Sequence, residues 1–224
     1  MAAASARPFL LTSIGKKYLM GLTGLVWAGF VFAHMAGNML IFVGADAYNK
    51  YGHLLTSGYF IYVAEAVLIL SLLVHVGCAI SLTLENRSAR PTKYAVTPNG
   101  SKGVTFASMT MAFHGSIILV FIITHLITFK FGTYYETTVD GVVMRDLHRL
   151  MIEVFQSPSY VFWYVVSLVL LGLHLSHGVG SIFQSLGLRN ERTAPTIQKA
   201  SCLYGFVVAA GFLSQPIYVF FFAG

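Results

Sequence analysis

The chain has 224 residues, of which 56% are hydrophobic and only 10% are charged, and its mean hydropathy is +0.73. A composition this apolar excludes a water-soluble globular protein and indicates an integral membrane protein. The net charge of +6 at pH 7 comes from basic residues near the ends of apolar segments, so it does not indicate a nucleic-acid partner. The two cysteines, Cys78 and Cys202, lack the spacing of a disulfide framework or an iron–sulfur site.

Five segments are long and apolar enough to cross a bilayer as helices. In chain order they are residues 18–43, 59–84, 104–129, 159–186 and 201–223. Each has more than about 18 residues with almost no charge, and a helix rises about 1.5 Å per residue across a hydrocarbon core about 30 Å thick. We therefore predict an all-α integral membrane protein, in which residues 1–224 form one domain built as a bundle of five transmembrane helices.

Basic residues near the helix ends predict the orientation of the bundle, because the side richer in Lys and Arg stays in the cytoplasm. One side has Arg7, Lys16, Lys17, Arg87, Arg90, Lys93, Lys102, Arg189, Arg192 and Lys199. The other side has only Lys50, Lys130, Arg145 and Arg149. We expect the N-terminus in the cytoplasm and the C-terminus outside.

Four histidines, one in each of the first four apolar segments, are the candidate functional residues. An ionisable side chain is costly in hydrocarbon, so a histidine at membrane depth indicates function. Counting the helical rise along helices of alternating direction puts His34 and His125, the outer pair, in the outer half of the membrane. The same count puts His75 and His174, the inner pair, in the inner half. The result is two layers of two histidines, each from two different helices.

Each layer provides the protein ligands of a six-coordinate b-type haem, since the porphyrin supplies four nitrogens and the protein must supply two. Zinc or non-haem iron would require three or four protein ligands at one depth, usually including a carboxylate or thiolate. Small residues near the histidines would allow a flat ring to approach the helix backbones; they are Gly37, Ser71, Ala79 and Gly178. We therefore predict two haem b groups, with the outer pair and the inner pair as the axial ligands of the haem irons.

Two further histidines compete for the role of haem ligand. His114 lies about three helical turns before His125, on nearly the same face and at the depth of the inner pair. His177 lies one turn after His174 and would replace it or hydrogen-bond a neighbouring group. Both remain alternatives at this point.

Polar residues outside these layers indicate a second candidate site. His53 and His148 lie in the predicted outer loops, where a solvated histidine is ordinary. Glu65 is the only acid within the five segments. We expect Glu65 and His53 to line a pocket at the outer face.

Five runs of sequence, in order, resemble a known family. They are FAHMAGN (32–38), DAYNKYGHLL (46–55), LLVHVGCAI (72–80), IITHLITF (122–129) and LGLHLSHGVGSIFQSLGL (171–188). They look like the dihaem cytochrome b membrane-anchor subunit of bacterial succinate dehydrogenase or fumarate reductase. The resemblance covers all five helices. It implies that the inner pair holds the haem nearer the cytoplasm and the outer pair the haem nearer the outside, in agreement with the depths counted above.

The resemblance also implies a function and partners. Members of the family are multi-pass proteins of the bacterial inner membrane. They relay electrons between an iron–sulfur subunit and quinone, while a flavoprotein subunit oxidises succinate. It implies menaquinone as the quinone, with Glu65 as the nearest counterpart of the family's acid beside the outer haem and His53 as a neighbour. Quinone chemistry moves protons with electrons, so a titratable group is expected there. Membrane lipid surrounds the chain, and a dimer of the whole complex is a further option.

This chain is expected to have no succinate-oxidising site and no catalytic residue of its own. It has no GxGxxG motif after a strand for a dinucleotide and no cysteine array for iron–sulfur clusters. Two other functions stay open, a cytochrome b anchor of another respiratory dehydrogenase and a proton-coupled transporter that uses its buried histidines and Glu65. A b-type haem band in a difference spectrum would separate the cytochromes from the transporter.

Overall fold

The computed structural model describes residues 8–89 and 106–223. Within this part of the chain, five helices are long and apolar enough to cross a membrane, which confirms the prediction of a multi-pass membrane protein. They are α1 (Ser13–Asn38) with its 3-10 extension η2 (Met39–Phe42), α3 (Phe60–Ser88), α5 (Met111–His125) with the π turn η4 (Leu126–Lys130), α7 (Pro158–Ser185) and α8 (Ala194–Phe222). Four basic residues used to predict the orientation, Arg7, Arg90, Lys93 and Lys102, lie outside the described residues, so the orientation stays a prediction.

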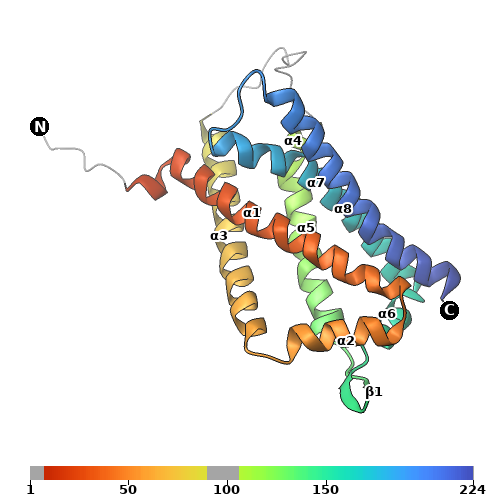
Figure 1. The fold of residues 1–224 in the computed structure, drawn as a ribbon. Helices are drawn as coiled ribbons and strands as arrows, with labels where there is room; N and C mark the ends of the chain where they lie inside the picture. Colours follow the sequence, from red (N-terminus) through yellow and green to blue (C-terminus); the bar gives the residue numbers. More distant parts are fainter. Residues whose placement is uncertain (1–7, 90–105, 224) are drawn as a thin grey trace, which may run out of the picture.

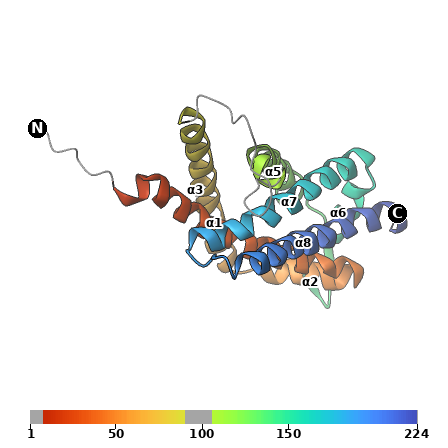
Figure 2. The same cartoon turned by 90° about the horizontal axis from the view of Figure 1, so that it is seen from above.

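The helices are unevenly packed against one another. α7 and α8 lie side by side, α1 contacts α3, α7 and α8, and α5 packs on α7 (Figures 1 and 2). The close approach of α7 and α8 depends on glycine, because a Cβ atom added at Gly205 would lie 2.9 Å from the backbone nitrogen of Ser176. Small residues are the usual means by which helices approach each other closely in membranes. α3 stands at the edge of the group and contacts mainly α1 (Figure 2).

Four spanning segments have limits that differ by several residues from those predicted. The first begins at Ser13 instead of residue 18, and the fifth begins at Ala194 instead of residue 201. The third is interrupted at Thr110, which separates the short helix α4 (Phe106–Met109) from α5, and its predicted start at residue 104 lies outside the described residues. The second continues beyond its predicted end at residue 84 to Ser88, so α3 contains Glu85 as well as Glu65. The chain before α1 has only a single 3-10 turn, η1 (Phe9–Leu11), in the described residues.

Three short elements that the sequence did not predict lie at one end of the helices. They are α2 (Ala45–Thr56), which joins η2 to α3, the hairpin β1 (Glu136–Val139) and β2 (Val142–Arg145), and α6 (Leu147–Phe155), all at the lower end in Figure 1. The hairpin turns at Asp140 and Gly141, whose φ angles are 52° and 78°, as a two-residue hairpin turn requires. The fold is therefore mainly helical, with one small two-stranded sheet.

The side chain of Asn49 connects these short elements. It is 2% exposed, donates a hydrogen bond to the Asp146 carboxylate at 2.8 Å and accepts one from the backbone N–H of His148 at 2.9 Å. Asp146 also caps α6 by accepting a hydrogen bond from the backbone N–H of Arg149 at 2.9 Å. These bonds hold α2 against the start of α6.

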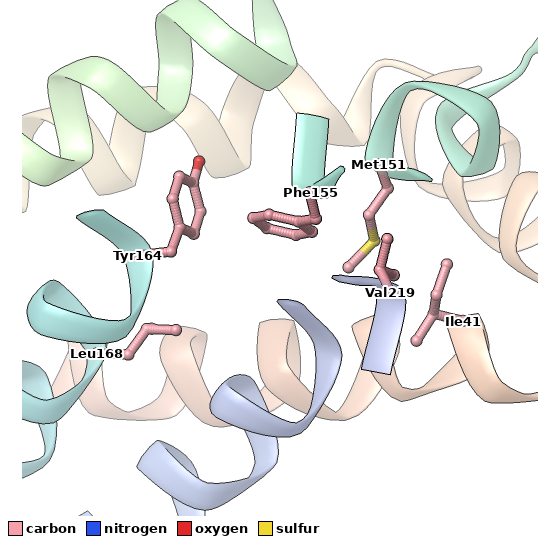
Figure 3. Packing of buried hydrophobic residues seen from close by; sticks show 6 residues of the cluster. All are labelled: Ile41, Met151, Phe155, Tyr164, Leu168 and Val219. Carbon is pink, nitrogen blue, oxygen red and sulfur yellow. The ribbon is translucent and has the colours of Figure 1, made fainter. Parts of the chain in front are cut away.

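The main buried cluster lies close to the same end of the bundle. Its residues come from η2, α6, α7 and α8, and they are Ile41, Met151, Phe155, Tyr164, Leu168 and Val219 (Figure 3). The rings of Phe155 and Tyr164 meet edge to face at 4.9 Å, a favourable arrangement for aromatic side chains. The hydroxyl group of Tyr164 points away from the cluster (Figure 3), and it reaches one of the candidate histidines.

Candidate functional site: two histidine pairs and a polar pocket

The outer pair consists of two rings in contact. His34 on α1 and His125 at the end of α5 have ring centroids 5.8 Å apart, with their planes at 83°. Phe30 stacks on His34 at 5.3 Å, and Phe129 lies 5.3 Å from His125. The structure thus brings together two histidines far apart in the sequence, in aromatic surroundings.

Hydroxyl groups engage the Nδ1 atoms of two candidate ligands. The Tyr164 hydroxyl lies 3.1 Å from Nδ1 of His125, and the Thr23 hydroxyl lies 3.2 Å from Nδ1 of His75. A bond at one ring nitrogen fixes the ring and leaves the other nitrogen, Nε2, for a metal. In the outer pair, His34 makes only a longer contact, 3.4 Å from Nδ1 to the side-chain nitrogen of Asn38.

The inner pair lies beside glycines of neighbouring helices. A Cβ atom added at Gly24 of α1 would lie 3.5 Å from Cε1 of His75, and one added at Gly115 of α5 would lie 3.7 Å from Cε1 of His174. His75 on α3 therefore packs beside α1, and His174 on α7 packs beside α5.

The rival ligands differ in their availability. His114 is 1% exposed, and its Nδ1 atom is buried without a hydrogen-bond partner in the described part of the chain, as is Nδ1 of His174. Buried polar atoms are normally satisfied, so an unpaired one requires an explanation. Nε2 of His177, by contrast, lies 3.1 Å from the Ser181 hydroxyl. His114 therefore remains a stronger rival than His177. His148 lies apart from both layers on α6, where its ring meets that of Tyr48.

Of the small residues expected to make room for a haem, Gly37 has a different role in the structure. The interpretation that Gly37 makes room for a flat ring is wrong, because a Cβ atom there would overlap the ring of Tyr51 on α2. Gly37 instead allows α2 to pack on α1. A Cβ atom at Gly178 would meet no atom within 4 Å, so that position does have space. Sequence reasoning missed Gly24 and Gly115, which a depth count along α1 and α5 would have put at the level of the inner pair.

The geometry of the outer pair can be compared with what a haem requires. Two metal–nitrogen bonds of about 2 Å, with roughly 1 Å from each nitrogen to its ring centre, separate two axial imidazole centroids by about 6 Å. The 5.8 Å found for His34 and His125 fits this value. Among the residues described, no group of three or more His, Cys, Asp or Glu is arranged to hold a metal ion. A haem iron requires only two protein ligands, so the absence of a three-ligand group among the described residues bears on sites for free metal ions and not on a haem.

A polar pocket of about 300 Å³ lies where α2, α3, η4 and β2 meet. It is lined by Gly52, His53, Thr56, Ile61, Tyr62, Glu65, Lys130, Tyr134, Arg145 and Leu147. The structure therefore puts Glu65 and His53 in the same pocket. Glu65 forms an ion pair with Lys130. In the sequence, Lys130 served only as a basic residue that indicates the orientation of the bundle.

Arg145 closes the pocket from the side of the hairpin. Its guanidinium donates hydrogen bonds to the backbone carbonyls of Lys130, Gly132 and Thr133 at 3.3, 3.3 and 3.1 Å. It also lies over the ring of Tyr134, 5.4 Å from the centroid. Partial burial lowers the pKa of Arg145 from its ordinary value, but an arginine remains charged at neutral pH. Arg145 thus fixes the backbone at the end of the third spanning segment.

The opposite end of the bundle has an ion pair of its own. Lys16 on α1 pairs with Glu85 on α3, and it also donates a hydrogen bond to the Ser81 hydroxyl at 2.7 Å. The Ser13 hydroxyl donates to the same carboxylate at 3.1 Å. This network joins α1 to α3 and includes none of the candidate histidines.

Comparisons with known proteins give no family. No family model, curated protein or solved structure matches the chain. The function must therefore be inferred from the two histidine pairs and the pocket.

Proposed function

We propose that this chain is the membrane-anchor and electron-transfer subunit of a bacterial succinate dehydrogenase or fumarate reductase, and that it binds two b-type haems. The observation that carries the proposal is the outer pair. His34 and His125 come from separate helices, and their ring centroids lie 5.8 Å apart, close to the roughly 6 Å required of two axial imidazoles on one iron. The Tyr164 hydroxyl at Nδ1 of His125 would leave Nε2 to bind the iron.

The inner group supports a second haem at another depth. Thr23 engages Nδ1 of His75, which leaves Nε2 of that ring available in the same way. Gly24 and Gly115 keep side chains away from the two rings of the inner pair, so a flat group would meet less obstruction there. His174 would supply the second ligand, with His114 as its competitor for the partnership with His75.

The haems would supply one-electron transfer across the bundle. The residues of this chain would hold the two irons at different depths, surround them with apolar and aromatic side chains, and bind quinone in the polar pocket. Glu65 and His53 line that pocket, and either side chain would exchange protons with a bound quinone. Menaquinone is the quinone that we propose. Succinate chemistry would take place on a separate flavoprotein, with an iron–sulfur subunit between the two.

Haem binding is tested by difference spectroscopy on the complex purified from membranes. We expect the wild-type chain to bind two b-type haems, and His34→Ala and His125→Ala each to lose about half of the haem. His148→Ala is the matched control, since that ring lies apart from both layers. Absence of a b-type band in the wild type, or unchanged haem in both variants, would contradict the proposal. Detergent-extracted protein is quantified in parallel to exclude loss of the chain itself.

The inner ligands are tested by a second set of variants. We expect His75→Ala to remove the spectral signal of the inner haem while the soluble partners still oxidise succinate with an artificial electron acceptor. Comparison of His174→Ala with His114→Ala identifies the second ligand, because only the true ligand should remove that haem. If neither His75 nor His174 affects haem content, the inner assignment is wrong.

A further inference from the structure

The polar pocket contains a cation, Lys130, beside the acid Glu65 that was expected there. We propose that Lys130 is a quinone-binding residue, whose ammonium group donates a hydrogen bond to a ring oxygen of the quinone or quinol. This inference rests on the proposed quinone site and adds to it a specific donor. It is carried by the position of Lys130 on a π turn, its ion pair with Glu65 and the backbone bonds made by Arg145.

The π turn η4 changes the direction in which Lys130 leaves the helix that carries His125. In a continuous α-helix, a residue five positions after His125 would lie about 140° around the axis. Here the backbone N–H of Phe131 bonds the carbonyl of Leu126 at 2.9 Å, the five-residue spacing of a π turn, so the residues of η4 are rotated from their positions in an α-helix. Single π turns within α-helices occur often at functional sites. Lys130 therefore lies in the pocket, on the π turn that directly follows His125.

The pocket has more positive than negative charge on its lining. Lys130 and Arg145 are its cations and Glu65 is its only carboxylate, with His53, Tyr62 and Tyr134 as the remaining titratable groups. The Nη atoms of Arg145 donate to three backbone carbonyls, and its Nε atom is buried without a partner among the described residues. The ammonium group of Lys130 instead pairs with Glu65, which also lines the pocket. An excess of donors suits a ligand that presents oxygen acceptors, as a quinone ring does.

The ion pair between Lys130 and Glu65 is accessible to a ligand. The side chains of Lys130 and Glu65 are 40% and 31% exposed, so the ion pair is not enclosed by other parts of the described chain. A ring oxygen can therefore replace a carboxylate oxygen as the acceptor of the ammonium group. Release from Lys130 would at the same time free Glu65 to exchange a proton with the bound ring.

The test compares three variants of the complete, haem-loaded complex. Lys130→Met removes the donor, Lys130→Arg retains a cationic donor, and Lys50→Met is the matched control. Lys50 is also a lysine of the segments predicted to lie outside and is also paired with an acid, Asp140, but it does not line the pocket. The assay is the fumarate-dependent oxidation of 2,3-dimethyl-1,4-naphthoquinol, with rates normalised to haem content.

We expect Lys130→Met to raise KM for the naphthoquinol about tenfold or more, since a hydrogen bond from a charged donor is lost. The value of kcat should change less, and Lys130→Arg and Lys50→Met should stay within about threefold of the wild type. KM does not depend on how much protein folds, so poor expression would not hide the result. An unchanged KM in Lys130→Met would overturn the inference about Lys130 alone. Absence of haem and of naphthoquinol oxidation in the wild type would instead overturn the proposed function.

Discussion

The hydrogen bond between Tyr164 and His125 allows a stability prediction that needs no knowledge of the bound groups. Tyr164 is 5% exposed, and its hydroxyl lies 3.1 Å from Nδ1 of His125. Tyr164→Phe keeps the ring and its edge contacts with Phe121 and Phe155, both at 4.9 Å. The substitution removes only the oxygen, which leaves a buried imidazole nitrogen without its partner.

The expected loss follows from that unpaired nitrogen. A buried polar atom left without its hydrogen bond costs about 1–3 kcal/mol, and for a chain of this size each kcal/mol lowers Tm by about 2–4 °C. We therefore expect Tyr164→Phe to lower Tm by roughly 2–12 °C. Tyr164→Ala should lower it further, because loss of a buried aromatic ring costs about 3–5 kcal/mol.

The assay is thermal unfolding of the purified chain in detergent, with Tyr160→Phe as the control. Tyr160 is an exposed tyrosine one turn earlier on α7, so loss of its hydroxyl should leave Tm within about 1 °C of the wild type, as expected for surface positions. If Tyr164→Phe unfolds at the wild-type temperature while Tyr164→Ala does not, the ring matters but the hydrogen bond does not. That result would refute the view that Tyr164 fixes the ring of His125.

Two further predictions concern helix packing and an exposed ion pair. Gly205→Val should prevent close packing of α7 on α8 and reduce the yield of folded protein in detergent. Gly178→Ala is the control and should be tolerated, because its Cβ would meet nothing within 4 Å. Equal yields of the two variants would disprove this account of the α7–α8 contact. The hydrogen bond with Asp140 raises the pKa of Lys50 above its ordinary value of 10.5, so the small stabilisation by this pair is complete below that pH and is lost as the pH rises through the raised pKa. The difference in Tm between the wild type and Lys50→Met should therefore shrink above about pH 10.5, and a difference that grows there would contradict this sign.

The candidate site was partly predictable from the sequence because depth in a membrane is a one-dimensional property. Hydropathy gives the approximate position of a spanning helix in the chain, and the fixed rise per residue then gives the approximate level of each histidine. This is why His34 and His125 could be assigned to one layer before their rings were seen to meet. The same count cannot give the rotation of a helix about its axis, so the choice between His174 and His114 as a partner for His75 stayed open.

The polar pocket was less predictable. Glu65 and His53 stood out because a carboxylate is rare in an apolar segment and a histidine lay close to it in the sequence. Lys130 and Arg145 gave no such signal, since basic residues at segment ends are explained by orientation alone. Their role depends on a π turn and a hairpin, and neither has a distinctive pattern in the sequence.

The sequence by itself determined a membrane protein with five spanning helices and histidines at two depths, because apolar length and helical rise are local properties of the chain. Only the tertiary structure decided which rings meet, that Gly37 faces Tyr51, and that Lys130 pairs with Glu65. Those contacts join residues far apart in the sequence. They depend on how each helix is rotated and packed against its neighbours, which no local pattern specifies.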